Sequence, residues 1–499
     1  MYKIISDLGW KSLTFILALL CTSIVIAVYL IVKTNFGAFI PIGLMLVFIV
    51  WKFWGEFGFL CFFVVNPLFW PGAVSAKIPF VGQIVPDLPI QQTFLILFGV
   101  GYFIYFILQT RKKELQIMPR AALVLILFSG LMVSMFFAMY PDISELYSYI
   151  RIILYGVSIY ALVYFMVDTT KKAHIIIKLL IITGILFSLV LSIPAVKESY
   201  IPDSNNLADL GGTWRLPFVG FRFWLNSGMI APCLAITISL AWAKILVAKN
   251  VIKKLVWIGF SVIMLVTLVT TVSRTGIYGV VIGVALIMII YSFSPQKRIY
   301  KPFRLLIRSG TAVIMFLLFI YLGSVVLNNF VKSSDVATQD FIQNKLTVPP
   351  LSRDASAQTR ISLYRDSLDL SSRYLLGAGF NALPRNYGLN HHSLYTMMLA
   401  GLGVIGFPLY VFLIIWSLVR CVKGGYFGDA EIFNLSMYTF SGVVLFLIMG
   451  FGFPIIEAIW GTTLFWVLLA LAAKIPELVK TEPRVTKTLA TERVNEMRR

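Results

Sequence analysis

Apolar and polar positions alternate along this chain on a scale of about twenty residues. Long apolar runs are separated by short polar connections over nearly the whole length. A run of about 17–25 residues crosses about 30 Å of hydrocarbon as a helix, and a backbone in lipid must satisfy its own hydrogen bonds, which favours helices over open strands. We therefore predict an all-α polytopic membrane protein.

The apolar runs define fourteen candidate spans, of which the third is short. If the second and third are re-entrant, twelve crossings remain and the orientation is unchanged. We therefore expect about 12–14 transmembrane helices. The spans are residues 13–33, 38–54, 57–70, 91–109, 120–140, 147–167, 173–194, 225–247, 253–271, 275–293, 310–330, 393–419, 433–451 and 457–474.

Basic residues concentrate in short connections on one side of these spans. They lie near residues 111–120, 171–172, 249–254, 297–308 and 420–423. The positive-inside rule assigns these connections to the cytoplasm. Orientation in the membrane accounts for the net charge of +20, so we do not expect nucleic acid as a partner.

The same topology divides the chain into three parts. Residues 1–194 form N-terminal transmembrane helices, residues 195–475 hold further helices and a long periplasmic loop at 331–392, and residues 476–499 form a basic cytoplasmic tail. Within the long loop, Ile361, Tyr364 and Leu368 are spaced on one helical face. We therefore expect a surface helix in the loop, lying along the membrane.

Two adjacent histidines, His391 and His392, precede an apolar helix that is punctuated by glycines. They are two of only three histidines in the chain. An imidazole where water meets the bilayer titrates near neutral pH and can accept a proton from a hydroxyl group. The pair is therefore our catalytic candidate, and the alternative is that it only marks a polar helix start.

Four arginines, Arg215, Arg222, Arg274 and Arg360, lie on the predicted periplasmic side, where the positive-inside rule makes arginine scarce. The planar guanidinium group stays charged and binds phosphate oxygens with two hydrogen bonds. The arginines therefore indicate an anionic lipid headgroup, unless each pairs with a carboxylate or extends to the interface. Neither acidic pairs at metal-ligand spacing nor a phosphate-binding glycine loop is found on this side, so we expect no metal and no cofactor.

Four motifs in this order resemble the bacterial O-antigen polymerase and O-antigen ligase superfamily over about residues 195–475. They are Arg222 through Gly228, Ser273-Arg274-Thr275-Gly276, Arg360 followed by Leu376-Gly377-Ala378-Gly379-Phe380, and His392-Ser393 followed by Gly403.

The resemblance implies an inverting, metal-independent glycosyl transfer at the periplasmic face of the bacterial inner membrane. The donor would be an undecaprenyl-diphosphate-linked glycan. By the same resemblance, His392 would deprotonate the acceptor hydroxyl, while Arg222, Arg274 and Arg360 would bind the diphosphate. Because the histidine is doubled, His391 stays open as the base.

The resemblance leaves several functions open because the acceptor differs among its members. We favour polymerisation of surface polysaccharide or exopolysaccharide repeats, with a chain-length regulator as a further partner. An O-antigen ligase, which builds lipopolysaccharide, and a protein O-oligosaccharyltransferase would use the same donor. A lipid-linked glycan transporter is the alternative from another class, although transporters usually carry ionisable residues in mid-span.

Overall fold

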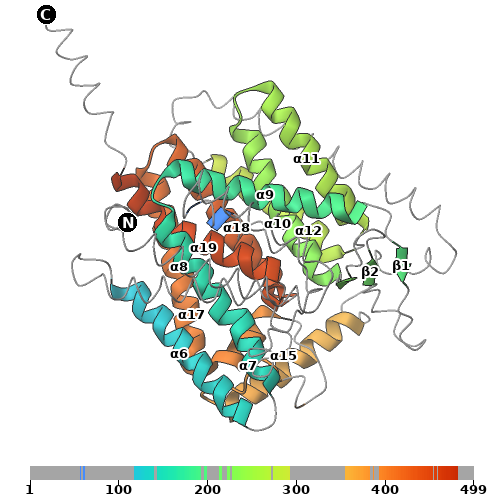
Figure 1. Cartoon of the computed structure of the whole chain (residues 1–499), viewed down its shortest axis with the longest axis vertical. Coiled ribbons are helices and arrows are strands. Elements are labelled where there is room, and N and C mark those ends of the chain that lie inside the picture. The colour runs from blue at the N-terminus through green and yellow to red at the C-terminus, as the bar shows by residue number, and fades with distance from the viewer. Residues whose placement is uncertain are drawn as a thin grey trace, which may run out of the picture.

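The computed structural model describes a large helical part of the chain (Figure 1). The predicted spans 13–33, 38–54, 91–109 and 310–330 lie outside the described residues. The described residues are 57, 60–61, 64, 117–139, 143–192, 196–198, 213–215, 222–224, 227–270, 273–292, 355–382, 386, 393–452, 454–457 and 459–481.

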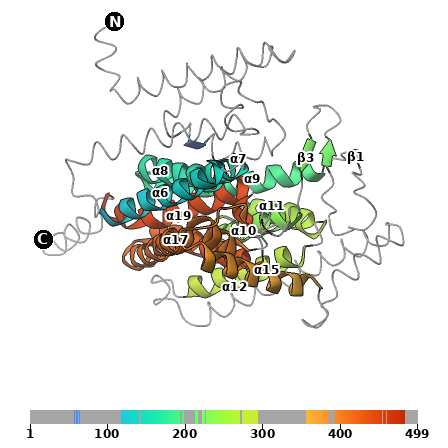
Figure 2. The same cartoon turned by 90° about the horizontal axis from the view of Figure 1, so that it is seen from below.

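Helices account for nearly all of this described part. In Figure 2, α6 to α9 form one layer, α12 and α15 lie on the opposite side, and α10, α17 and α19 lie between them. The elements are α6 (Ile117–Met139), α7 (Ile143–Tyr149), the π-helical η4 (Ile150–Leu154), α8 (Tyr155–Met166), α9 (Thr170–Ser192), α10 (Ser227–Val247), α11 (Val251–Thr270), α12 (Arg274–Ser292), α15 (Ala355–Arg373), α17 (Leu394–Phe427), α18 (Ala430–Gly450), the 3-10 helix η6 (Ile455–Glu457) and α19 (Ile459–Thr481).

Nine of the predicted spans fall mostly within the described residues, and each overlaps one of these helices or the consecutive helices α7, η4 and α8. Seven helices in the described part are long and apolar enough to cross a membrane. The prediction of an all-α polytopic membrane protein is therefore confirmed. The total of 12–14 helices stays a prediction, because several of the spans lie outside the described residues.

The centre of the bundle is the contact of α8, α17 and α19. Trp466 of α19 is fully buried there, and a Cβ atom added to Gly156 of α8 would overlap its indole ring. A glycine at this position lets the two helices approach until the α8 backbone touches the ring. Tyr160 and Tyr410 pack against the same indole from α8 and α17. Aromatic burial therefore fixes how these three helices sit together.

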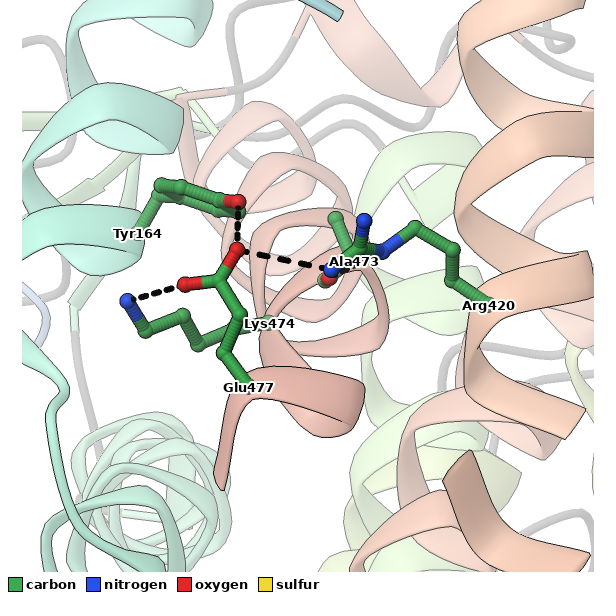
Figure 3. A network of polar contacts seen from close by, with 5 residues as sticks. All are labelled: Tyr164, Arg420, Ala473, Lys474 and Glu477. Atoms are coloured by element: carbon green, nitrogen blue, oxygen red, sulfur yellow. Dashed lines mark hydrogen bonds and ion pairs between the residues drawn. The ribbon is translucent and has the colours of Figure 1, made fainter. Parts of the chain in front are cut away.

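A polar network joins the same three helices at the end that we predict to be cytoplasmic (Figure 3). The Glu477 carboxylate accepts hydrogen bonds from the Tyr164 hydroxyl and from the Lys474 ammonium, the latter at 2.8 Å. Arg420 Nη2 lies 3.4 Å from the same carboxylate, and Arg420 Nε donates to the Ala473 carbonyl at 2.9 Å. Each charge in the network thus has a partner where the helices leave the apolar core.

Helix α19 continues to Thr481, past the position where we expected the cytoplasmic tail to begin. Pro476 lies inside the helix although proline lacks the N–H group that a helix interior uses. Arg420 donates to the Ala473 carbonyl close to this proline, and Glu477 anchors the turn that follows. These side chains stabilise a turn that the proline alone would weaken.

Other predicted cytoplasmic connections meet at this end as well. Lys244 Nζ, near the end of α10, lies 3.5 Å from His174 Nδ1 at the start of α9 and 4.3 Å from the ring centroid of Tyr438 in α18. Cys421 and Thr439 connect the end of α17 with α18. The connections at 171–172, 249–254 and 420–423 therefore share one end of the bundle, as the charge pattern predicts.

Three short strands form where we expected only a loop. They are β1 (Val196–Glu198), β2 (Thr213–Arg215) and β3 (Arg222–Trp224), paired antiparallel in the order β1-β2-β3. Figure 1 shows β1 and β2 beyond the end of α9. Valine, threonine and aromatic residues, which favour strands, occur in these three segments.

The expected surface helix is present as α15, which is longer than the segment from which we predicted it. Ile361 and Leu368 are exposed on its outer face, at 50% and 57% of their full accessibility. The opposite face is buried, with Leu363 and Leu370 in a small core that also contains Ala400 of α17. The helix is therefore docked on the bundle by one face and exposes apolar side chains on the other, and its position along the membrane stays a prediction.

Candidate functional site

The end of α18 and the residues after it, 447–452, are the point where the motif-bearing elements meet. The last carbonyl groups of a helix lack partners within the helix. Here the Tyr395 hydroxyl of α17 donates to the Leu447 carbonyl at 2.7 Å. The Tyr364 hydroxyl of α15 donates to the Phe451 carbonyl at 2.6 Å. Hydroxyl groups from two other helices thus complete the end of α18, and the contact fixes all three helices relative to one another.

The start of α17 is held at the same place. Ser393 is its N-cap residue, and its hydroxyl accepts a hydrogen bond from the Tyr395 amide at 3.2 Å. The same hydroxyl is 3.4 Å from the Gly450 carbonyl, to which it donates. His391 and His392 lie outside the described residues, but they directly precede this buried N-cap in the chain. The catalytic candidates are therefore adjacent in sequence to the meeting point at residues 447–452.

Helix α12 begins at Arg274, and its first turns approach the end of α18. The Ser273 hydroxyl accepts a hydrogen bond from the Gly276 amide at 3.4 Å, as an N-cap residue does. One turn later, a Cβ atom added to Gly279 would lie 2.6 Å from Cε of Met449. The glycine therefore allows close approach of α12 to α18. Of Arg274 itself the structure describes the backbone.

The three-stranded sheet places two further candidate arginines opposite each other on neighbouring strands. Arg215 of β2 and Arg222 of β3 are register partners in the antiparallel pair. Helix α10 begins five residues after Arg222, and its Ala231 lies against Gly276 of α12, where an added Cβ would be 2.7 Å away. The chain after the sheet thus leads into the helix that packs against the start of α12. The structure describes the backbone of both arginines.

Arg360 lies in α15, one turn before Tyr364. Because Tyr364 hydrogen-bonds the carbonyl of Phe451, this part of α15 is fixed beside the end of α18. As with the other arginines, the described part of Arg360 is its backbone. Two of the elements that meet at residues 447–452 therefore carry Arg274 and Arg360, and the third begins directly after the histidine pair in the chain.

Helix α17 is interrupted at Gly403, about two and a half turns after its first residue, Leu394. At Gly403 the backbone has φ 65° and ψ −170°, a conformation that residues with a Cβ atom rarely adopt. The Val404 amide consequently donates to the Leu375 carbonyl at 2.8 Å, and not to the Ala400 carbonyl as a regular helix requires.

The segment that fills this interruption is residues 375–381, here called the glycine loop. Its Ala378 and Gly379 amides donate to the freed Ala400 carbonyl at 2.7 and 3.1 Å. The loop therefore accepts one hydrogen bond from α17 and donates two to it. This exchange joins the loop to the helix through the backbone, and it explains why a glycine is needed at position 403.

The glycine loop has no amide left for a ligand in its central part. Every backbone N–H group from residue 377 to residue 382 donates to a protein acceptor, so the loop does not act as a phosphate cradle of the kind that glycine-rich loops form. The acceptors are, in chain order, the Tyr374 carbonyl, the Ala400 carbonyl twice, the Glu145 carboxylate twice and the Gly379 carbonyl.

Glu145 of α7 is the residue of this region that our sequence reasoning missed. Its side chain is fully buried, and its carboxylate accepts hydrogen bonds from the amides of Phe380 and Asn381. The sequence shows Glu145 only as an acidic residue in the connection between the predicted spans 120–140 and 147–167. The Phe380 and Asn381 amides are more than 230 residues away in the chain, and a backbone amide leaves no mark in the pattern of side chains.

Among the described residues, no group of three or more histidine, cysteine, aspartate or glutamate side chains could hold a metal ion. The candidate chemistry that the sequence predicts for this end uses the arginines and the two histidines. Guanidinium groups stabilise a diphosphate, and an imidazole accepts a proton from a hydroxyl group. Together they suit the transfer of a group away from a diphosphate.

Comparison with known protein families gives a match for part of this chain. Residues 259–411 match the model of a family described as O-antigen ligase. The comparisons with curated proteins and with solved structures gave no significant match. The matched region contains α12, α15, the glycine loop and the start of α17, but not Arg215 or Arg222. Over residues 259–411, the resemblance to the O-antigen polymerase and ligase superfamily that the motifs predict is therefore confirmed.

Proposed function

We propose that this chain is an inner-membrane glycosyltransferase that polymerises repeat units of a surface polysaccharide or exopolysaccharide. The donor in this proposal is an undecaprenyl-diphosphate-linked glycan, and transfer takes place at the periplasmic face. The observation that carries the proposal is the meeting of α12, α15 and the start of α17 at residues 447–452. Helices α12 and α15 bear Arg274 and Arg360, and His392 directly precedes the N-cap of α17 in the chain.

In the proposed reaction, His392 takes the proton of an acceptor sugar hydroxyl, and His391 is the alternative base. The acceptor oxygen attacks the anomeric carbon of the donor from the face opposite the diphosphate. A new glycosidic bond forms, the bond between the anomeric carbon and the diphosphate oxygen breaks, and undecaprenyl diphosphate leaves with the electron pair. Attack from the opposite face inverts the configuration at that carbon.

The arginines supply the charge that the leaving group needs. Negative charge grows on the diphosphate as the bond breaks, and preorganised cations stabilise that charge most in a site from which water is excluded. We assign this role to Arg222, Arg274 and Arg360, with Arg215 beside Arg222 in the sheet register. Fixed guanidinium groups make a metal-independent mechanism sufficient for a diphosphate leaving group.

An O-antigen ligase is the second candidate, and the description of the matched family favours it. Ligation and polymerisation share donor, base and cations but differ in acceptor, which is a lipid A core sugar or a second lipid-linked repeat. A protein acceptor would make the chain a protein O-oligosaccharyltransferase. As a polymerase the chain would also have a partner that sets the chain length.

The test is glycan extension by purified protein supplied with a synthetic undecaprenyl-diphosphate-linked repeat. Wild type is expected to give a ladder of products, and His392→Ala none. His174→Ala is the matched control, because this third histidine lies at the opposite end of the bundle. Retained long products from His392→Ala together with loss in His391→Ala would reassign the base. Retention in both variants would remove the histidines from the mechanism.

A second substitution tests the arginines. Arg274→Lys keeps the charge but loses the two-pronged hydrogen bond to phosphate, so we expect the transfer rate to fall by at least about tenfold. Arg373→Lys is the control, since Arg373 is exposed on α15 and pairs with Asp369. A product formed only after addition of a lipid A core acceptor would identify a ligase. Near-normal transfer by Arg274→Lys would show that this arginine is structural.

A further inference from the structure

We infer that Glu145 is a positioning residue whose buried carboxylate fixes the glycine loop and, through the loop, the placement of α15 against α17. This holding role is a property of the fold. Its consequence for transfer rests on the proposed function, because α15 carries Arg360 and the start of α17 follows His392.

The contact itself is strong for its size. The two carboxylate oxygens of Glu145 accept from consecutive amides of the loop, those of Phe380 and Asn381, the second at 2.9 Å. Hydrogen bonds to an ionised acceptor are about twice as strong as neutral ones. Gly379 makes the approach possible, because a Cβ atom there would lie 2.5 Å from the carboxyl carbon. The missing side chain at Gly379 thus leaves the space that the Glu145 carboxylate occupies.

A second contact from the next turn of α7 reinforces the first. The Ser148 hydroxyl donates to the side-chain carbonyl oxygen of Asn381 at 3.1 Å. Helix α7 is itself anchored, because the Tyr149 hydroxyl donates to the Leu127 carbonyl of α6 at 2.9 Å. Two consecutive turns of a fixed helix therefore hold one short loop, which limits both its position and its rotation.

The loop transmits this placement in two directions. On one side it continues directly from α15, whose Leu363 and Leu370 share a small core with Ala378 of the loop. On the other side it is joined to α17 by the backbone exchange with Ala400 and Val404. A shift of the loop therefore changes the position of α15 relative to the first two turns of α17.

Glu145 does not touch the substrate in this arrangement. Its side chain is fully buried, and both of its oxygens point to loop amides. It is therefore distinguished from a general base by what its loss would change. Removal of a base alters the pH dependence of the rate, whereas loss of a positioning residue lowers the rate and leaves that dependence in place.

Three variants separate these roles. Glu145→Gln keeps the size of the side chain, but its NH₂ group is a donor and faces one loop amide without an acceptor. Gly379→Ala disturbs the same contact from the loop. Glu431→Gln is the matched control, because Glu431 is exposed in the first turn of α18 at the opposite end.

The first measurement is hydrogen exchange on purified protein in detergent, with the peptide that covers the glycine loop resolved by mass spectrometry. In Glu145→Gln and in Gly379→Ala we expect exchange at Phe380 and Asn381 to rise by at least about tenfold, because a hydrogen bond to a charged acceptor is lost. In Glu431→Gln these amides should exchange as in wild type. Unchanged exchange in Glu145→Gln would overturn the inference.

The second measurement is transfer from the lipid-linked donor. Displacement of reacting groups by about 1 Å can cost about 100-fold in rate, so we expect kcat to fall by at least about tenfold, with KM for the donor and the pH profile little changed. The double variant should be no worse than the more affected single variant, because both substitutions break one contact.

The two proposals fail in different ways. Faster loop exchange with unchanged transfer in Glu145→Gln would refute the positioning role and leave the proposed function intact. Absence of transfer by wild type with every acceptor would refute the proposed function, and the exchange result alone would then decide whether Glu145 holds the loop. If Glu145→Gln does not accumulate, Gly379→Ala tests the same contact, and normal exchange and transfer in that variant would overturn the inference.

Discussion

Substitution of Gly403 by alanine is the most direct test of the interrupted helix α17. The backbone at this position has φ 65°, in the left-handed region that residues with a Cβ atom rarely adopt. An added Cβ would also overlap the backbone of Leu376 and lie 2.5 Å from the Gly377 amide nitrogen. Because both neighbours are backbone atoms, no side chain can move aside, and the glycine loop must separate from α17.

The expected cost follows from the hydrogen bonds that this separation breaks. Residue 403 becomes helical when the loop leaves, so the strain of its left-handed conformation is relieved and does not add to the cost. Separation breaks three hydrogen bonds of the exchange, and a regular bond from Val404 to Ala400 would replace one of them. The net loss of two bonds costs about 1–3 kcal/mol. We therefore expect the free energy of unfolding to fall by about 1–3 kcal/mol.

The assay is an SDS titration in mixed micelles, followed by tryptophan fluorescence. Gly259→Ala is the control, because Gly259 lies inside α11 with nothing within 4 Å of an added Cβ. Alanine there should raise stability by up to about 1 kcal/mol, since glycine is the poorer helix former. If Gly403→Ala were as stable as Gly259→Ala, the interruption of α17 and the role we assign to its glycine would be wrong.

Two further predictions concern the opposite end and the membrane surface. Arg420→Ala removes the donor to the Ala473 carbonyl and a partner of Glu477, so we expect a loss of about 1–3 kcal/mol in the same titration, while transfer per folded molecule is unchanged. Loss of transfer with normal stability would contradict the structural role. A spin label at Leu368→Cys should meet lipid-dissolved oxygen more often than one at Ser362→Cys, because Leu368 is an exposed apolar position on the outer face of α15. Equal oxygen contact at both positions would show that α15 does not lie on the bilayer.

The positions of the membrane helices could be predicted closely because hydropathy reports the solvent directly. The expected span 275–293, for example, is α12 at Arg274–Ser292. Helix α17 is the instructive exception, since it continues to Phe427 and the predicted span ends at residue 419. We ended the span before Arg420 because of its charge. The guanidinium is nevertheless mostly buried, stacked over Trp416 and bonded to the neighbouring helix.

The sequence predicted the candidate site only as a set of chain segments on the periplasmic side of the membrane. Charge and residue type indicated Arg274, Arg360 and His392, and the elements that carry Arg274, Arg360 and the N-cap after His392 meet at residues 447–452. The meeting point itself was not predictable. It is made by hydroxyl groups that donate to backbone carbonyls at the end of α18, and a carbonyl group is present at every position of a sequence.

Glu145 makes a second contact that could not be predicted from the sequence. A buried carboxylate is costly unless hydrogen bonds compensate it, so an acidic residue in apolar surroundings implies a partner. The nearest cation in the chain is Arg151, six residues after Glu145, but the donors that the structure shows are amides of the glycine loop. This contact could not be predicted from the sequence, because only the fold places the glycine loop beside Glu145.

The motifs of this end therefore contain residues of two physically different kinds. Gly377, Gly379 and Gly403 all have positive φ values, and they permit one backbone exchange between the glycine loop and α17. The arginines and histidines supply charge and a proton acceptor. Substitution of the first kind should raise loop exchange and lower stability, with loss of transfer as a consequence. Substitution of the second kind should remove transfer from a protein whose loop exchange is that of wild type. A variant such as His392→Ala that loosened the glycine loop would show that the histidine helps to build the site, and this distinction requires exchange and transfer to be measured on the same preparation.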